Sequence, residues 1–198
     1  MTRNVALTGS VAAGKSTVGA LFREWGATVI DIDVLVRELQ RRDEPVFDAI
    51  VAAFGPGVLD PRGELDRRLL RRRILADEGD RRRLEAIVHP AVEIRRRELL
   101  AAARMRGDLI VIADVPLLFE AGDPSAFDSV IVVDAPAGER RRRLMQHRGF
   151  DASDADLLIA AQMPSAEKRA RATWIIDNDG DRDRLVRRTR AVWKALQH

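Results

Sequence analysis

Apolar residues follow two patterns that alternate along the chain. Short apolar runs predict five β-strands, at residues 4–8, 27–32, 109–113, 129–133 and 173–176. Apolar residues at helical spacing predict helices at residues 17–25, 139–147, 153–163 and 182–196. The runs at 109–113 and 129–133 are continuous, as expected of strands buried on both faces. Strands separated by helices are typical of a parallel sheet with helices on both sides, so the pattern predicts the α/β class.

The stretch from residue 34 to residue 107 follows a different pattern. It is helical and rich in arginine, and no run in it predicts a strand. We interpret it as a helical insertion after the second predicted strand. Within it, Pro90 is expected to start or kink a helix, because proline lacks the N–H that a helix interior uses. His89 is then expected to be extended or to lie at a helix boundary.

The composition excludes several classes of protein. A length of 198 residues suits one compact domain with an insertion, and 46% hydrophobic residues are too many for a disordered chain. Cysteine is absent, which excludes disulfides, thiolate metal sites and a cysteine nucleophile. The 34 basic and 31 acidic residues are interspersed, so we expect no nucleic-acid partner. No apolar run approaches the ~20 residues that span a bilayer and no signal peptide is recognisable, so we expect a cytoplasmic protein without membrane contact.

Residues 9–17, Gly-Ser-Val-Ala-Ala-Gly-Lys-Ser-Thr, match the phosphate-binding pattern G-x-x-x-x-G-K-[ST]. They lie between the first predicted strand and the first predicted helix. In such a loop, backbone N–H groups and the helix N-terminus surround a phosphate group, and glycine permits the tight curve. Lys15 adds a positive charge for the terminal phosphates of a nucleotide, and the Ser16 hydroxyl is a ligand for Mg²⁺. The alternative is an ordinary glycine-rich turn with an exposed lysine.

Two carboxylates, Asp31 and Asp33, end the second predicted strand. Because the carboxyl ends of parallel strands meet at one edge of a sheet, we expect both near the phosphate loop. Either carboxylate can orient an acceptor hydroxyl or take its proton. The alternative is that Asp33 only caps the helix that begins near Val34. Asp114, at the end of the third apolar run, resembles a magnesium-binding aspartate but is a weak candidate.

With these motifs in view, the chain resembles the dephospho-coenzyme A kinase family nearly from end to end. The resemblance rests on the order and spacing of the motifs that follow the phosphate loop. These motifs are VIDID at 29–33, FGPGVLDPRGELDRRLL at 54–70, LEAIVHP at 84–90, DVPLLFEAG at 114–122, RRRRLMQHRGF at 140–150, AAQM at 160–163 and IIDNDG at 175–180.

The resemblance implies an architecture and a reaction. Residues 1–33 and 108–198 would form a P-loop core with a five-stranded parallel sheet, in which residues 138–166 are a helical lid over ATP. The insertion at 34–107 would bind the coenzyme. The implied reaction transfers a phosphoryl group from ATP, with Mg²⁺, to the ribose 3′-hydroxyl of dephospho-coenzyme A. The products are coenzyme A and ADP, in the last step of coenzyme A biosynthesis. The sequence does not indicate an oligomeric state.

The resemblance also implies roles for individual residues. Asp33 corresponds to the base at the acceptor hydroxyl, Arg143 to a lid arginine near the transferred phosphoryl group, and Asn178 to the region around the adenine. Contacts with the phosphates of ATP are expected from Ala12, Ala13, Gly14, Lys15, Ser16 and Thr17. The acceptor side is expected to include Asp31, Arg67 and His89. Two structural alternatives stay open: Arg143 paired with Glu139 along a helix, and a His89 with no role in binding.

Some positions depart from the usual pattern of the family. Ser10 and Ala12 stand where glycine is common, and an alanine at 12 is compatible with phosphate binding if its backbone dihedral angles are ordinary. His147 stands four residues after Arg143, where the family usually has a second arginine, and Arg148 lies beside it. Neutral imidazole is a weaker partner for phosphate than guanidinium.

Two other functions share the phosphate loop. A P-loop kinase of the nucleoside monophosphate kinase type would act on a different acceptor, and the histidine-proline insertion and the PLLFE segment argue against it. A nucleotide-dependent switch specific for GTP would need an N-K-x-D-type segment for base recognition. None is present, because Asn178 is followed by aspartate and glycine.

Overall fold

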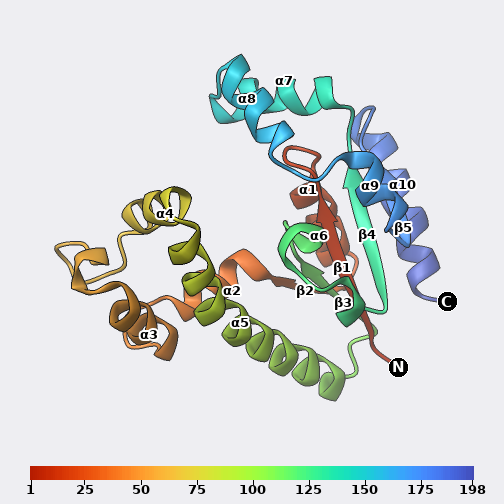
Figure 1. Cartoon of the computed structure of the whole chain (residues 1–198). Helices are drawn as coiled ribbons and strands as arrows, with labels where there is room; N and C mark the ends of the chain where they lie inside the picture. Colours follow the sequence, from red (N-terminus) through yellow and green to blue (C-terminus); the bar gives the residue numbers. More distant parts are fainter. The chain divides into compact units, whose positions relative to one another are not determined.

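Five strands form one sheet in the order β2-β3-β1-β4-β5 (Figure 1). The computed structural model describes residues 1–198. The strands are β1 (Arg3–Gly9), β2 (Thr28–Asp31), β3 (Ile110–Asp114), β4 (Ser129–Asp134) and β5 (Trp174–Asp177). Strand β1 pairs in parallel with β3 and β4, and β4 pairs in parallel with β5. The predicted α/β class with a five-stranded sheet is confirmed, and each of the five apolar runs forms a strand.

The segments between the strands are helical. The α-helices are α1 (Lys15–Glu24), α2 (Ile32–Leu39), α3 (Pro45–Phe54), α4 (Arg67–Ala76), α5 (Glu78–Arg106), α6 (Leu118–Ala121), α7 (Ala137–Arg148), α8 (Ala152–Ala160), α9 (Ser165–Ala170) and α10 (Arg182–Leu196), and two short 3-10 helices are η1 (Pro56–Val58) and η2 (Pro124–Ala126). Helix α10 begins and ends at the predicted residues, and α6 and α9 were not predicted. None of the helices is long and apolar enough to cross a membrane.

Successive residues of the inner strands are buried in different cores. Leu7 of β1 lies in a core with Phe22 of α1 and Trp193 of α10. Its neighbour Ala6 lies in a second core, which includes Leu118 and residues of β4. Because side chains alternate along a strand, both faces of β1 and β4 are covered. This burial on both sides explains why the sequence of β4 is a continuous apolar run.

The chain divides into two compact units, one of residues 1–30 and 102–198 and the other of residues 31–101. The first unit contains the sheet and the phosphate loop. The second is helical and has its own core, which includes Ile50 of α3 and Val88 of α5. Its only β-type pairing is an isolated antiparallel bridge between Leu59 and Leu65. Binding of the coenzyme by the helical insertion stays a prediction.

Pro90 lies inside helix α5 rather than at its start. The expected helix start at Pro90 is therefore wrong, as is the expected extended or boundary conformation of His89. Proline removes one hydrogen bond from a helix interior, at a cost of about 3 kcal/mol. Val88 and Val92, on either side of Pro90, are both buried in the core of the helical unit. Burial of this apolar face outweighs the lost hydrogen bond and keeps the helix continuous.

Candidate active site

The loop between β1 and α1 has the backbone geometry of an anion site. Gly14 precedes α1 with a φ of +98°, and no side chain caps the helix. The first N–H groups of α1 are therefore free of side-chain partners, and they carry the positive end of the helix dipole. A phosphate group fits this arrangement without further side chains. Lys15 and Ser16, the first two residues of α1, lie at this end of the helix.

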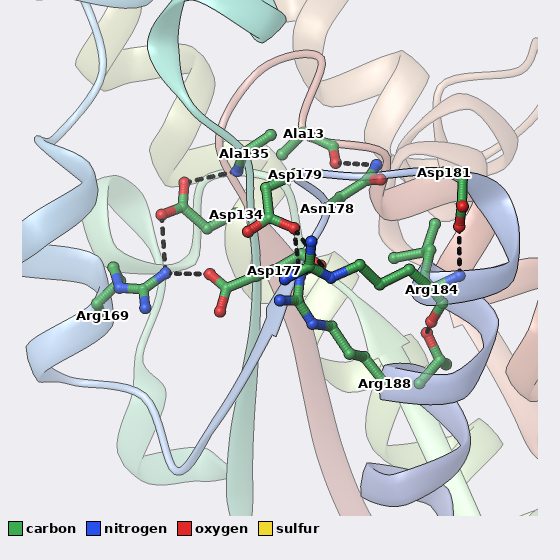
Figure 2. Close-up of polar contacts among 12 residues, drawn as sticks. Ala13, Asp134, Ala135, Arg169, Asp177, Asn178, Asp179, Asp181, Arg184 and Arg188 are labelled. Carbon is green, nitrogen blue, oxygen red and sulfur yellow. Dashed lines mark hydrogen bonds and ion pairs between the residues drawn. The ribbon is translucent and has the colours of Figure 1, made fainter.

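Asn178 fixes the loop from the side of β5. Its side chain is buried, and Nδ2 donates a hydrogen bond of 2.8 Å to the carbonyl oxygen of Ala13 (Figure 2). A Cβ atom on Gly14 would overlap with Nδ2 of Asn178. Glycine is therefore required at position 14 for its positive φ and also because the Asn178 amide lies against it. The contact places Asn178 at the phosphate loop; its expected place near the adenine stays a prediction.

Ala12 adopts a left-handed conformation with a φ of +57°. An alanine at this position was expected to be compatible with phosphate binding if its backbone dihedral angles were ordinary. They are not ordinary. Such a conformation costs an alanine about 1–2 kcal/mol and persists only where neighbouring groups hold it. Arg143 provides that support, because its Nη1 donates to the carbonyl oxygens of Ala12 and Ala13 at 3.3 Å each. Nη2 of Arg143 donates to the carbonyl oxygen of Asn178 at 3.1 Å.

Replacing Ala12 by glycine is expected to raise the free energy of unfolding by about 1 kcal/mol, because glycine adopts a positive φ without strain. Urea unfolding followed by circular dichroism measures the change. Ala13→Gly is the matched control: Ala13 is fully buried and has no positive φ, so this change should destabilise the protein. Equal destabilisation by both changes would contradict strain at Ala12.

Lys15 and Asp114 form an ion pair. Nζ of Lys15 contacts Oδ1 of Asp114, and the two side chains are 19% and 13% exposed. Asp114 ends β3 and Lys15 begins α1, so the parallel pairing of β1 with β3 brings them together. The sequence signals for Asp114 were its place at the end of an apolar run and at the start of the motif DVPLLFEAG. Nothing in the sequence pointed to its pairing with Lys15.

Of Arg140, Arg143 and His147 on α7, only Arg143 makes a hydrogen bond to the phosphate loop. Arg143 Nε also donates to Glu139 at 3.1 Å, so the alternative ion pair and the loop contact occur together. Arg140 is buried, and its Nε donates to the carbonyl oxygen of Ala135 at 3.1 Å. Burial lowers the pKa of the Arg140 guanidinium, an effect that the charge of Asp134 opposes. His147 and Arg148 are exposed in the last turn of the helix.

The two aspartates after β2 differ in their contacts. Asp31 caps α2, because its Oδ1 accepts a hydrogen bond of 3.0 Å from the N–H of Val34. The alternative that Asp33 is the cap is therefore wrong. Asp33 lies in the first turn of α2, is exposed and has no hydrogen bond or ion pair within its own unit. Since α2 begins at Ile32, the two carboxylates are not on one extended strand as expected.

The other predicted acceptor residues lie in the helical unit. Arg67 begins α4 and donates to Oε1 of Gln40 and to the carbonyl oxygen of Arg37, at 3.2 Å each. These bonds connect α4 to the end of α2. His89 is exposed in the middle of α5. The acceptor roles of Arg67 and His89 stay predictions.

Asp134 and Asp177, at the ends of β4 and β5, hold the segment around Asn178. Neither carboxylate was predicted from the sequence as part of the site. Arg169 of α9 donates to Asp134 and to Asp177 (Figure 2). The hydrogen bond to Asp177 raises the pKa of Arg169. The backbone N–H of Asn178 donates to the carbonyl oxygen of Asp134 at 2.7 Å. These bonds fix the residue that supports the phosphate loop.

Comparison with known proteins identifies relatives along nearly the whole chain. Residues 3–183 match the family described as dephospho-CoA kinase. A dephospho-CoA kinase of Symbiobacterium thermophilum is 48% identical over 193 residues, which cover 98% of this chain and 81% of that protein. One from Geobacillus kaustophilus is 44% identical over 203 residues and is covered in full, as is this chain.

A crystal structure of a protein from Thermus thermophilus has the same fold. It superimposes with a TM-score of 0.84 at 34% sequence identity, and the alignment covers 98% of this chain and 97% of that one. The family match and the two relatives agree with the motifs that surround the phosphate loop. The chain belongs to the dephospho-CoA kinase family.

Proposed function

We propose that this chain transfers the terminal phosphoryl group of ATP to the ribose 3′-hydroxyl of dephospho-coenzyme A, giving coenzyme A and ADP. The observation that carries the proposal is the family match over residues 3–183. Membership of this family makes the chain a kinase with an alcohol group as acceptor and ATP as its co-substrate. The phosphate loop supports this function, because its backbone is shaped for an anion.

The phosphates of ATP are bound by the loop and the start of α1. Backbone N–H groups between Ala12 and Thr17 surround them, and Lys15 neutralises their charge. Lys15 is paired with Asp114 in the structure, so its ammonium group shifts from that carboxylate to the phosphates when ATP binds. Arg143 lies beside the loop, bound to two of its carbonyl oxygens, and from there stabilises the charge of the transferred group.

The residues of the loop fit a magnesium ion that is held mainly by the nucleotide. No group of three or more acidic or imidazole side chains is present that would bind a metal by itself. Ser16 Oγ and the Asp114 carboxylate are hard oxygen ligands of the kind that Mg²⁺ prefers. When bound, the ion would neutralise charge on the phosphates of the nucleotide. The Ser16 hydroxyl would hold it.

The acceptor is activated by Asp33. Its carboxylate is exposed and carries no hydrogen bond within its unit, so it is available to accept a proton. One oxygen of Asp31 accepts the capping bond from Val34, so we assign this residue to the local structure of α2. The helical unit binds the coenzyme, with Arg67 and His89 among its contacts.

An ADP-release assay with dephospho-coenzyme A tests the function. ATP turnover should depend on dephospho-coenzyme A and should produce coenzyme A in equal amount, measured by chromatography. The comparison panel consists of nucleoside monophosphates and free sugars, which the alternative kinase type would use. Turnover with a nucleoside monophosphate but not with dephospho-coenzyme A would refute the proposal.

A further inference from the structure

The chain contains only three lysines, at positions 15, 168 and 194, and Lys168 is the one that is completely buried. Its Nζ lies 2.6 Å from Oε1 of Glu120. The geometry of this contact is not that of a hydrogen bond, and Nζ makes no hydrogen bond to any other protein atom. An ammonium group has three donors, so burial with one ionic partner is costly. A methionine of similar length would fill the space without that cost, so packing does not explain the charge.

Glu120 connects the buried lysine to the backbone that precedes it. The same oxygen, Oε1, accepts a hydrogen bond of 3.2 Å from the N–H of Met163. Glu120 belongs to α6, in the connection that follows β3, while Met163 and Lys168 lie on either side of the start of α9. One carboxylate therefore attaches this segment at two points five residues apart.

The segment of residues 162–169, here called the return strap, also contacts the phosphate loop. Oε1 of Gln162 accepts a hydrogen bond of 2.7 Å from the N–H of Val11. The hydroxyl oxygens of Ser165 and Ser10 are 3.4 Å apart, and Ser165 Oγ also donates to Asp134 at 2.9 Å. Val11 immediately precedes the strained Ala12. Gln162 thus holds the loop on the side of the return strap, while Arg143 and Asn178 hold its carbonyl oxygens.

We propose that Lys168 and Glu120 are positioning residues of the kinase, which fix the return strap so that Gln162 keeps the phosphate loop in the shape that binds ATP. The ion pair acts through the backbone at Met163, one residue from Gln162. A loop held in its binding shape before ATP arrives loses less conformational entropy on binding. The inference rests on the proposed function for its biological meaning, but ATP binding to the loop is measurable without an acceptor.

A double-mutant cycle on ATP affinity tests the inference. Gln162 is partly exposed and its side-chain oxygen can be removed without disturbing a core, so Gln162→Leu should fold. We expect Gln162→Leu and Lys168→Met each to weaken ATP binding about tenfold by calorimetry, the effect of one lost hydrogen bond. Because Lys168 acts through Gln162, the double variant should bind ATP no more weakly than Gln162→Leu alone. At saturating ATP, kcat should change less than about twofold.

Lys194→Met is the matched control, because Lys194 is exposed on α10, and it should leave ATP affinity unchanged. If Lys168→Met does not fold, Lys168→Met combined with Glu120→Gln takes its place in the cycle, since it leaves no unpaired buried charge. The inference is overturned if Gln162→Leu binds ATP as tightly as the wild type. It is also overturned if the losses of ATP affinity caused by the two substitutions multiply in the double variant. If the wild-type chain binds ATP but does not phosphorylate dephospho-coenzyme A, the proposed function is refuted. The double-mutant cycle on ATP affinity still tests the role of Lys168 and Glu120 in that case.

Discussion

Replacing Lys15 by methionine is expected to lower kcat/KM for ATP by about 10³-fold, as measured by ADP release with dephospho-coenzyme A. Methionine has a similar length but no charge, so the substitution removes the ammonium group and little volume. In the structure this group is bound to Asp114, at the end of the strand beside β1. In the proposed function the terminal phosphates of ATP replace Asp114 as the partner of Lys15, so the variant lacks a positive charge that would neutralise them.

Two further variants distinguish the loss of the Lys15 charge from a loss of folded protein. Lys15→Arg keeps the charge, but its planar guanidinium is larger than an ammonium group, so we expect it to remain strongly impaired. Lys194→Met removes a lysine from the exposed surface and should keep full activity. Urea unfolding of all three variants checks that the loss at Lys15 is not a loss of folded protein. A Lys15→Met enzyme within tenfold of wild-type turnover would show that the loop does not bind the reacting phosphates.

The fold class was predictable because the sheet imposes a strong pattern on its own sequence. Burial on both faces requires apolar residues without alternation, and β4 shows this directly, because Ile131 and Val133 lie in one core and Val130 and Val132 in the other. Short helices such as α6, with four residues, have no periodicity to detect. Pro90 shows a different limit: local rules predicted a helix start or kink at Pro90 and a boundary at His89, but both residues lie inside α5, beside the buried Val88. A short stretch of sequence does not show which of its residues tertiary packing will bury.

The phosphate loop was predictable from the spacing of its residues, but the groups that support it were not. The contacts of Ala13 with Asn178 and of Lys15 with Asp114 join residues 165 and 99 positions apart. No local pattern specifies which carbonyl oxygen an amide or a guanidinium reaches across such distances. The resemblance to a family identified Arg143 and Asn178 as candidates. Their contacts with the loop, and the left-handed φ of Ala12 that they accompany, emerge only from the three-dimensional arrangement.

Asp33→Asn is expected to reduce kcat by about 10²- to 10⁴-fold, because an amide cannot take the proton of the acceptor hydroxyl. ATP affinity, measured by calorimetry, should change less than about twofold, since Asp33 has no role in holding the phosphates. Its neighbour provides a matched control with the same chemical change. Asp31 accepts the capping bond from Val34, and asparagine caps a helix about as well as aspartate. Asp31→Asn should therefore keep both the start of α2 and nearly full turnover.

The two substitutions distinguish the two assignments of the base, because they differ only in which carboxylate becomes an amide. Asp33 has no hydrogen bond within its own unit, so both of its carboxylate oxygens can accept the proton, whereas one oxygen of Asp31, Oδ1, already accepts the N–H of Val34. Loss of turnover in Asp31→Asn with an active Asp33→Asn would transfer the role of base to Asp31. Asp31 would then accept the proton on Oδ2, while Oδ1 keeps the capping bond to Val34.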